Sequence, residues 1–146
     1  MRSIGLAVLA SVCFATSSVA QATPAPKLKF LVHITHGPEA PTRAALGFHV
    51  AKAAVEEGHQ VTVFLAGDAV NLLRPGTLDQ LTGLGTGKLR ELFDALVAGK
   101  ARFYVSGGSS QARGLTQGDL AAAGGQFAAP RDLVRLAAES DRMFTY

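Results

Sequence analysis

The sequence of 146 residues contains one cysteine, Cys13, and it falls inside an apolar segment near the amino terminus. We expect this segment to be removed, which leaves a mature chain without any cysteine. Such a chain forms no disulfide, holds no thiolate metal site and carries no persulfide. An exported protein of this kind must rely on its hydrophobic core or on contacts between subunits.

The first 20 residues have the features of a secretory signal peptide. Arg2 supplies one positive charge, an apolar run spans residues 4–15, and Ser18-Val19-Ala20 places small residues at a cleavage site. The apolar run is shorter than the ~20 residues that a membrane-spanning helix needs. We expect cleavage after Ala20, or after Ala22, and export to the periplasm in a Gram-negative source or secretion otherwise. A linker over 21–27 and one domain over 28–146 would remain.

The sequence also lacks any cluster of basic residues. The formal charge is only +3, and the lysines and arginines are scattered along the chain without interleaved aromatic residues. Proteins that bind nucleic acid usually concentrate basic residues along one surface. The pattern therefore argues against nucleic-acid binding, and no second long apolar run follows the signal segment.

Strand-like and helix-like segments alternate along the mature chain. Apolar, β-prone segments predict strands at 28–34, 60–65, 101–105 and 143–146. The intervening segments predict helices at 42–57, 69–73, 88–98, 116–123 and 130–140. This alternation is typical of an α/β fold with a parallel sheet that is covered on both faces.

Three loops follow the predicted strands and should meet at the carboxyl edge of the sheet, where such folds bind ligands. They span residues 35–41, 66–69 and 106–114. Their polar and glycine residues form the candidate ligand-binding set: His36, Glu39, Asp68, Ser106, Gly107, Ser109 and Arg113. Arg113 could bind a carboxylate or oxyanion, or it could pair with Glu39 or Asp68 as a structural bridge.

The serines of the third loop raise the alternative of a hydrolase. A G-x-S-x-G elbow centred on Ser109 would require glycine at Gln111, so that motif is absent. His36 ends the first strand, and parallel neighbours would place it near Ser106, where it could act as a base. A metal held by His36 with Glu39 or Asp68 is a second alternative, although the spacing matches no recognised metal motif. The simpler interpretation is that the hydroxyls cap the following helix and satisfy loop amides.

The glycine-rich segment 83–88 resembles a phosphate-binding loop only superficially. A P-loop needs glycine where Thr82 stands and serine or threonine where Leu89 stands. We expect a flexible connection or a subunit contact here, with anion binding at the following helix start as the alternative. His59 lies in a predicted turn, where we expect it to be solvated.

Four segments together resemble the DsrE/DsrF-like (YchN-like) family. They are THGPE at 35–39, AAVEEGHQVTVFLAGDA at 53–69, YVSGGSSQARG at 104–114 and DRMFTY at 141–146. The resemblance implies a three-layer α/β/α fold with a five-strand parallel sheet, assembled as a homotrimer or homohexamer. It also implies a place in sulfur relay, because characterised members carry sulfur as a cysteine persulfide.

The resemblance places the reactive cysteines of such members at Ser106 and Ser109. A serine hydroxyl cannot replace a thiol in this reaction, because its pKa is far higher and oxygen carries no transferable sulfane sulfur. The activity therefore does not transfer with the fold. We expect an exported protein that binds a small polar or anionic ligand or a protein partner, without a cofactor. A serine- or metal-dependent hydrolase and a structural assembly protein remain the alternatives.

Overall fold

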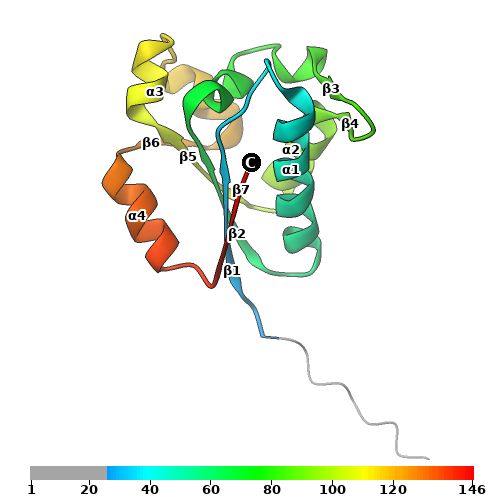
Figure 1. Ribbon diagram of the computed structural model, residues 1–146, viewed down its shortest axis with the longest axis vertical. Helices are drawn as coiled ribbons and strands as arrows, with labels where there is room; N and C mark the ends of the chain where they lie inside the picture. Colours follow the sequence, from blue (N-terminus) through cyan, green and yellow to red (C-terminus); the bar gives the residue numbers. More distant parts are fainter. Residues whose placement is uncertain (1–25) are drawn as a thin grey trace, which may run out of the picture.

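In the computed structural model, residues 26–146 are described, and they form one α/β unit built on a five-stranded sheet (Figure 1). The signal peptide and most of the linker expected from the sequence lie outside these residues. The sheet order is β6-β5-β2-β1-β7, and every pairing within it is parallel. Its strands are β1 (Lys29–Ile34), β2 (Gln60–Leu65), β5 (Arg102–Ser106), β6 (Gln126–Ala128) and β7 (Arg142–Thr145).

The helices lie on both faces of the sheet, as the predicted three-layer α/β/α fold requires (Figure 1). One face packs against α1 (Pro41–Glu56), α2 (Leu89–Ala98) and a 3₁₀ segment, η3 (Gln117–Ala123). The opposite face packs against α4 (Pro130–Ala138). Two further 3₁₀ segments, η1 (Gly67–Leu73) and η2 (Leu78–Gln80), and the short helix α3 (Gly107–Ala112) complete the loops at one end.

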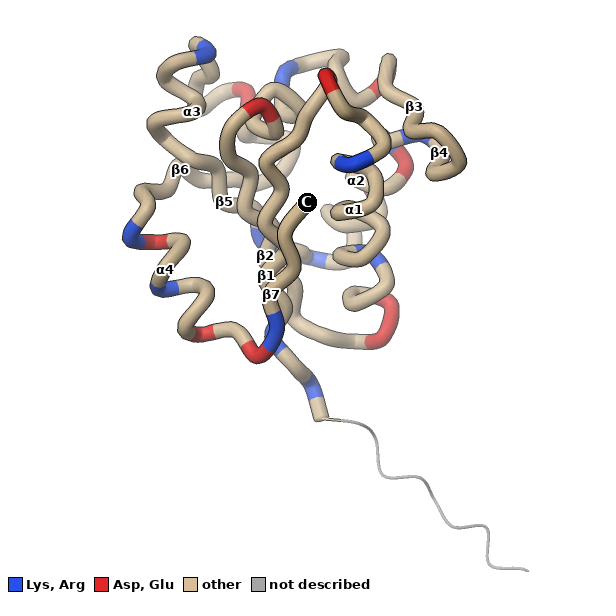
Figure 2. Tube along the Cα trace, in the orientation of Figure 1, with Lys and Arg blue, Asp and Glu red and all other residues tan. Residues whose placement is uncertain are grey.

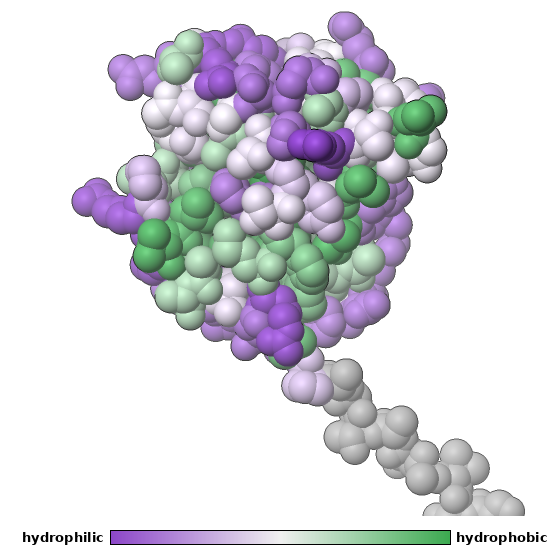
Figure 3. All heavy atoms as spheres, viewed as in Figure 1, coloured by the Kyte–Doolittle hydropathy of each residue, from purple (hydrophilic) through white to green (hydrophobic). Residues whose placement is uncertain are grey.

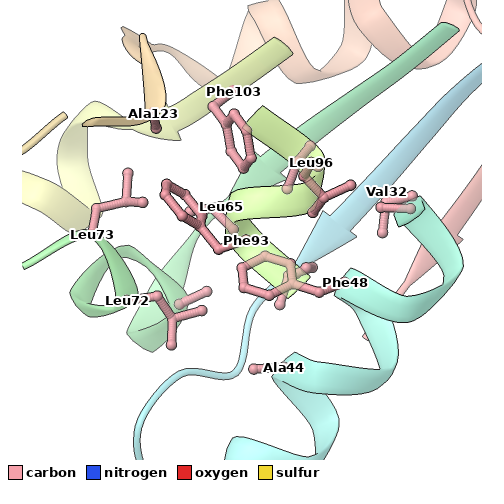
Figure 4. Packing of buried hydrophobic residues seen from close by; sticks show 14 of the residues in the cluster. Val32, Ala44, Phe48, Leu65, Leu72, Leu73, Phe93, Leu96, Phe103 and Ala123 are labelled. Atoms are coloured by element: carbon pink, nitrogen blue, oxygen red, sulfur yellow. The ribbon is translucent and has the colours of Figure 1, made fainter. Parts of the chain in front are cut away.

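The central strands are apolar on both faces because both faces are covered. In β2, Val63 and Leu65 join the core beneath α1 and α2, whereas Phe64 joins the smaller core beneath α4. Three rings connect α1, α2 and β5 in the larger core: Phe93 lies 6.4 Å from Phe48 and 5.4 Å from Phe103, between ring centroids (Figure 4). This packing fixes the strands whose ends carry the site.

Two features of the fold were missed in the sequence. Strand β6 is only three residues long and its central residue, Phe127, is 39% exposed, so it gives little periodic signal. The glycine-rich segment expected to be a flexible connection contains a small antiparallel hairpin, β3 (Thr82–Gly83) with β4 (Gly87–Lys88).

The expectation of a solvated His59 was wrong. Its side chain is 12% exposed, its ring stacks on Phe30 at 5.0 Å, and its Nδ1 accepts a hydrogen bond from the Leu28 amide at 3.3 Å. The turn after α1 is therefore fastened to the start of β1.

Candidate functional site

The first two loops at the carboxyl edge of the sheet contact each other through their backbones. Gly37, in the loop after β1, lies so close to the loop after β2 that an added Cβ would stand 2.2 Å from the Asp68 carbonyl oxygen. The Ala69 amide also donates to the Thr35 carbonyl at 3.3 Å. Only glycine permits this approach, so Gly37 sets the spacing of the first two loops.

The two serines of the third loop bind backbone amides. Ser106 is the N-cap of α3, and its Oγ accepts from the Ser109 amide at 3.4 Å. The Ser109 Oγ accepts from the Gly67 amide at 3.0 Å and thereby joins α3 to the loop after β2. Both hydroxyls thus perform the capping and loop-fastening role that the sequence offered as the simpler interpretation.

Arg113 pairs with Asp68 across the same junction. Its Nη2 and Nε donate to Asp68 Oδ1 at 2.7 and 3.1 Å, and its Nη1 donates to the Ser109 carbonyl at 3.3 Å. Of the two roles that the sequence left open for Arg113, the structure therefore shows the structural bridge, with Asp68 rather than Glu39 as the partner. The guanidinium charge is largely compensated by the Asp68 carboxylate.

His36 does not lie beside the serines. Strand β2 stands between β1 and β5, so the prediction that parallel neighbours bring His36 to Ser106 was wrong. Two strand spacings, about 10 Å, separate the ends of β1 and β5. His36 Nε2 instead accepts from Arg43 Nη1 at 3.1 Å, which leaves the proton on Nδ1, 3.3 Å from Thr35 Oγ1. No nucleophile–base pair is formed between His36 and either serine.

Glu39 is held by its own loop. Its two carboxylate oxygens accept from the Gly37 amide at 2.9 and 3.0 Å. The carboxylate therefore stabilises the tight turn before α1 and does not orient His36. Within residues 26–146, no group of three or more His, Cys, Asp or Glu side chains is arranged to hold a metal ion.

A cavity of about 530 Å³ opens beside these loops, between the β1–α1 loop, η1 and η2. It is lined by two of the predicted residues, Glu39 and Asp68. The remaining lining was not anticipated from the sequence: Pro38, Asn71, Arg74, Pro75, Thr77, Gln80 and Leu81. Arg74 lies in an irregular segment that was not singled out from the sequence, and its charge was the overlooked signal.

Arg74 is the only cationic side chain in the lining of this cavity, and it is positioned from both sides. Its Nε donates to Asn71 Oδ1 at 3.1 Å, and its Nη2 donates to the Arg113 carbonyl oxygen. The α3 loop therefore contributes to the cavity indirectly, through its main chain. Gly107 lies apart from it, in the wall of a separate 420 Å³ cavity formed with Ser110, Gln111, Leu115 and Phe127.

His33 is a half-buried histidine on the α4 side of the sheet that was not among the candidate residues. His33 Nε2 is buried without a hydrogen-bond partner, and the ring meets Phe64 edge-on at 5.7 Å between centroids. Burial lowers the pKa of His33, because a charged imidazole would lose its hydration there. The folded protein thus favours the neutral ring.

The model of the DsrE/DsrF-like family matches residues 28–146. The chain belongs to the DsrE/DsrF-like family. No match was found among curated proteins. None of the helices in the described part of the chain is long and apolar enough to cross a membrane.

Two solved structures share the fold of this chain. The YchN protein from E. coli is 18% identical, with a TM-score of 0.60, over 82% of this chain and 98% of its own. BT1422 from Bacteroides thetaiotaomicron, described as a conserved protein of unknown function, is 12% identical, with a TM-score of 0.61, over 86% of this chain and 100% of its own. At these identities the likeness concerns the fold alone.

Proposed function

We propose that this DsrE-like protein binds a small polar ligand in the carboxyl-edge cavity and performs no covalent chemistry there. The observation that carries the proposal is the cavity of about 530 Å³ whose lining includes Glu39, Asp68 and Arg74. Such a volume is typical of small-molecule sites, which often occur at the carboxyl edge of parallel sheets.

The lining favours a ligand with both an anionic and a hydrogen-donating group. Arg74 offers the positive charge, and the Glu39 carboxylate, whose partner is only the neutral Gly37 amide, can pair with an ammonium group. Asp68 adds an acceptor oxygen to the lining, although Arg113 already compensates its charge. Amide and hydroxyl groups of Asn71, Thr77 and Gln80 complete the polar lining. Small zwitterions such as amino acids have this combination, and simple anions have only half of it.

The serines hold the loops in place and are not arranged to react. Their hydroxyls are already engaged by the Ser109 and Gly67 amides, and His36 is engaged elsewhere. A role related to sulfur metabolism, as the family resemblance implies, would then be exercised through binding and not through a cysteine persulfide. The hydrolase alternative requires an activated serine, which this arrangement lacks.

Titration by two-dimensional NMR tests the proposal. Amino acids are added to the mature protein, with succinate as the anion-only comparison. We expect saturable shifts of the amides at 71–81 with the zwitterions. The variant Arg74→Gln should weaken them at least about tenfold, since a charged hydrogen bond is lost. Arg131→Gln, an exposed change on α4, is the matched control. Shifts that are unaffected by Arg74→Gln would contradict the proposal.

We further propose that the protein is exported and that copies of the chain associate through the side that carries β7. That face is largely apolar over β7 and α4 (Figure 3). Its exposed apolar residues include Met143 at 43%, Phe144 at 40% and Val134 at 70%, a grouping that monomeric proteins usually avoid. A homotrimer or homohexamer would cover it.

Light scattering after size-exclusion chromatography tests this association. Phe144→Asp should shift the protein toward the monomer. Leu84→Asp, which changes an apolar residue that is 89% exposed on the β3–β4 turn, should leave the assembly intact. A monomeric wild-type protein, or an assembly that only Leu84→Asp disrupts, would contradict the proposed contact.

A further inference from the structure

A second polar cavity lies at the opposite end of the sheet, where the strands begin. Its volume is about 350 Å³, and it is lined by Lys27, His59, Gln60, Val61, Gly99, Lys100 and Arg102. A smaller hollow of about 120 Å³ shares Gln60 and Arg102 with it. In the tube view, basic and acidic positions both lie at this lower end, near the starts of β1 and β7 (Figure 2).

The charges of this amino-edge cavity are unbalanced. Lys27, Lys100 and Arg102 line it, whereas no carboxylate belongs to its lining. Two acidic groups lie nearby: Glu57 is 3.5 Å from Nε2 of His59, which lines the cavity, and Glu139, which lines the adjoining hollow, accepts from Arg135 at 3.3 Å. Arg102 is held in place by the hydrogen bond from its Nη2 to Thr62 Oγ1 at 2.9 Å, which leaves its other guanidinium donors available.

The backbone at Lys100 gives an independent reason to regard this cavity as a site. Lys100 has φ of 60°, and it is the one residue other than glycine with positive φ in the described part of the chain. It closes α2 in a Schellman motif: its amide donates to the Val97 carbonyl, and the Ala101 amide donates to the Leu96 carbonyl, both at 3.0 Å. Glycine is the usual residue at this position.

Helix α1 provides the comparison within the same molecule. Its end has the same motif, with the Gly58 amide on Val55 and the His59 amide on Ala54, each at 2.9 Å. There the left-handed position is occupied by Gly58, with φ of 84°. Thus the same turn uses glycine beside α1 and a lysine beside α2, where the side chain faces the cavity.

A lysine near a helix end also offsets the negative end of the helix dipole. That effect does not require the left-handed backbone, because a lysine anywhere in the last helical turn would provide it. We propose instead that the amino-edge cavity binds a tetrahedral oxyanion, a phosphate or sulfate group, through Lys27, Lys100 and Arg102. This site is separate from the carboxyl-edge cavity, and either can exist without the other.

Titration with inorganic phosphate at constant ionic strength tests the proposal. Binding is monitored through the NMR signals of the amides of Gln60, Gly99 and Lys100. We expect saturable shifts that chloride does not reproduce. Lys100→Gly and Arg102→Gln should each weaken phosphate binding about tenfold or more. Lys52→Gln, which removes a lysine paired with Glu56 on α1, should bind as wild type does.

Lys100→Gly also separates binding from folding. Glycine suits the left-handed position, so its thermal midpoint should equal or exceed that of the wild type. Unchanged phosphate affinity in Lys100→Gly would overturn the proposal, as would a lowered midpoint, which would show a structural role for the lysine. Absence of saturable shifts at the amino edge of the wild-type protein would overturn it as well.

Discussion

Arg113 and Asp68 join two loops that are 45 residues apart in the sequence. The guanidinium donates from Nη2 and Nε to one carboxylate oxygen, at 2.7 and 3.1 Å, and holds α3 against η1. The side chains are 29% and 52% exposed, so water screens much of their attraction. The pair therefore positions the loops more than it stabilises the fold.

A double-mutant cycle of Arg113→Gln and Asp68→Asn tests this role. We expect a coupling free energy of about 0.2–1 kcal/mol in chemical denaturation, the range of exposed ion pairs. A coupling of several kcal/mol would show that the pair is a main support of the fold.

The Ser109 hydroxyl is the other link between the same loops. Ser109→Ala leaves the Gly67 amide without its partner, and we expect the free energy of unfolding to fall by about 1–2 kcal/mol. Ser106→Ala removes only the α3 cap, with an expected loss of about 0.5–1 kcal/mol.

Reaction of the folded protein with a fluorophosphonate probe tests whether either serine is an activated nucleophile. We expect no labelling of either serine, because neither has a base in hydrogen-bonding reach. Labelling that disappears in Ser106→Ala or Ser109→Ala would favour the hydrolase alternative.

We expect any side chain at Gly37 to force the loops after β1 and β2 apart. The methyl group of Gly37→Ala would meet the Asp68 carbonyl at 2.2 Å, so the loops must separate, at a cost of about 1–3 kcal/mol. Amide shifts should spread over both loops. Gly108→Ala is the control, because nothing lies within 4 Å of its added Cβ and alanine favours the helix. Equal stability of the two variants would refute the close contact.

His33 should make the folding stability depend on pH. In the unfolded chain the imidazole has its ordinary pKa of 6.5, whereas burial lowers the pKa of His33 in the folded chain. Below that pH the unfolded state binds more protons, so the free energy of unfolding falls as the pH drops, until the folded form is protonated too.

Replacement of His33 by leucine should remove this contribution. Chemical denaturation at pH 7.5 and at pH 5.5 measures how far the free energy of unfolding falls in each protein. We expect a smaller fall in His33→Leu than in the wild type. An equal fall in both proteins would show that the His33 imidazole does not contribute.

The fold could be predicted from the sequence because the pattern of apolar residues within each segment indicates its secondary structure. Apolar segments such as Val61–Leu65 are buried on both faces, and the alternation with helices leaves a parallel sheet as the simple solution. Strand β6 lacked such a pattern, because Phe127 is partly exposed and the strand has only three residues.

The candidate site could be predicted from the sequence only in part. Which of its residues contact one another depends on the order of the strands across the sheet. Parallel strands ensured that the loops after β1, β2 and β5 met at one edge. The placement of β2 in the middle, however, separates His36 from Ser106 and gives Asp68 to Arg113. Arg74 reaches the cavity from an irregular segment, whose course no periodicity reveals.

The most direct test of the binding proposal is a comparison of ligand titrations by NMR in the wild type, Arg74→Gln and Ser106→Ala. We expect amino acids to shift the cavity amides in the wild type and in Ser106→Ala, and to bind at least about tenfold more weakly in Arg74→Gln. If Ser106→Ala abolishes binding while Arg74→Gln retains it, the serine loop itself is the site and the binding proposal for the cavity is wrong.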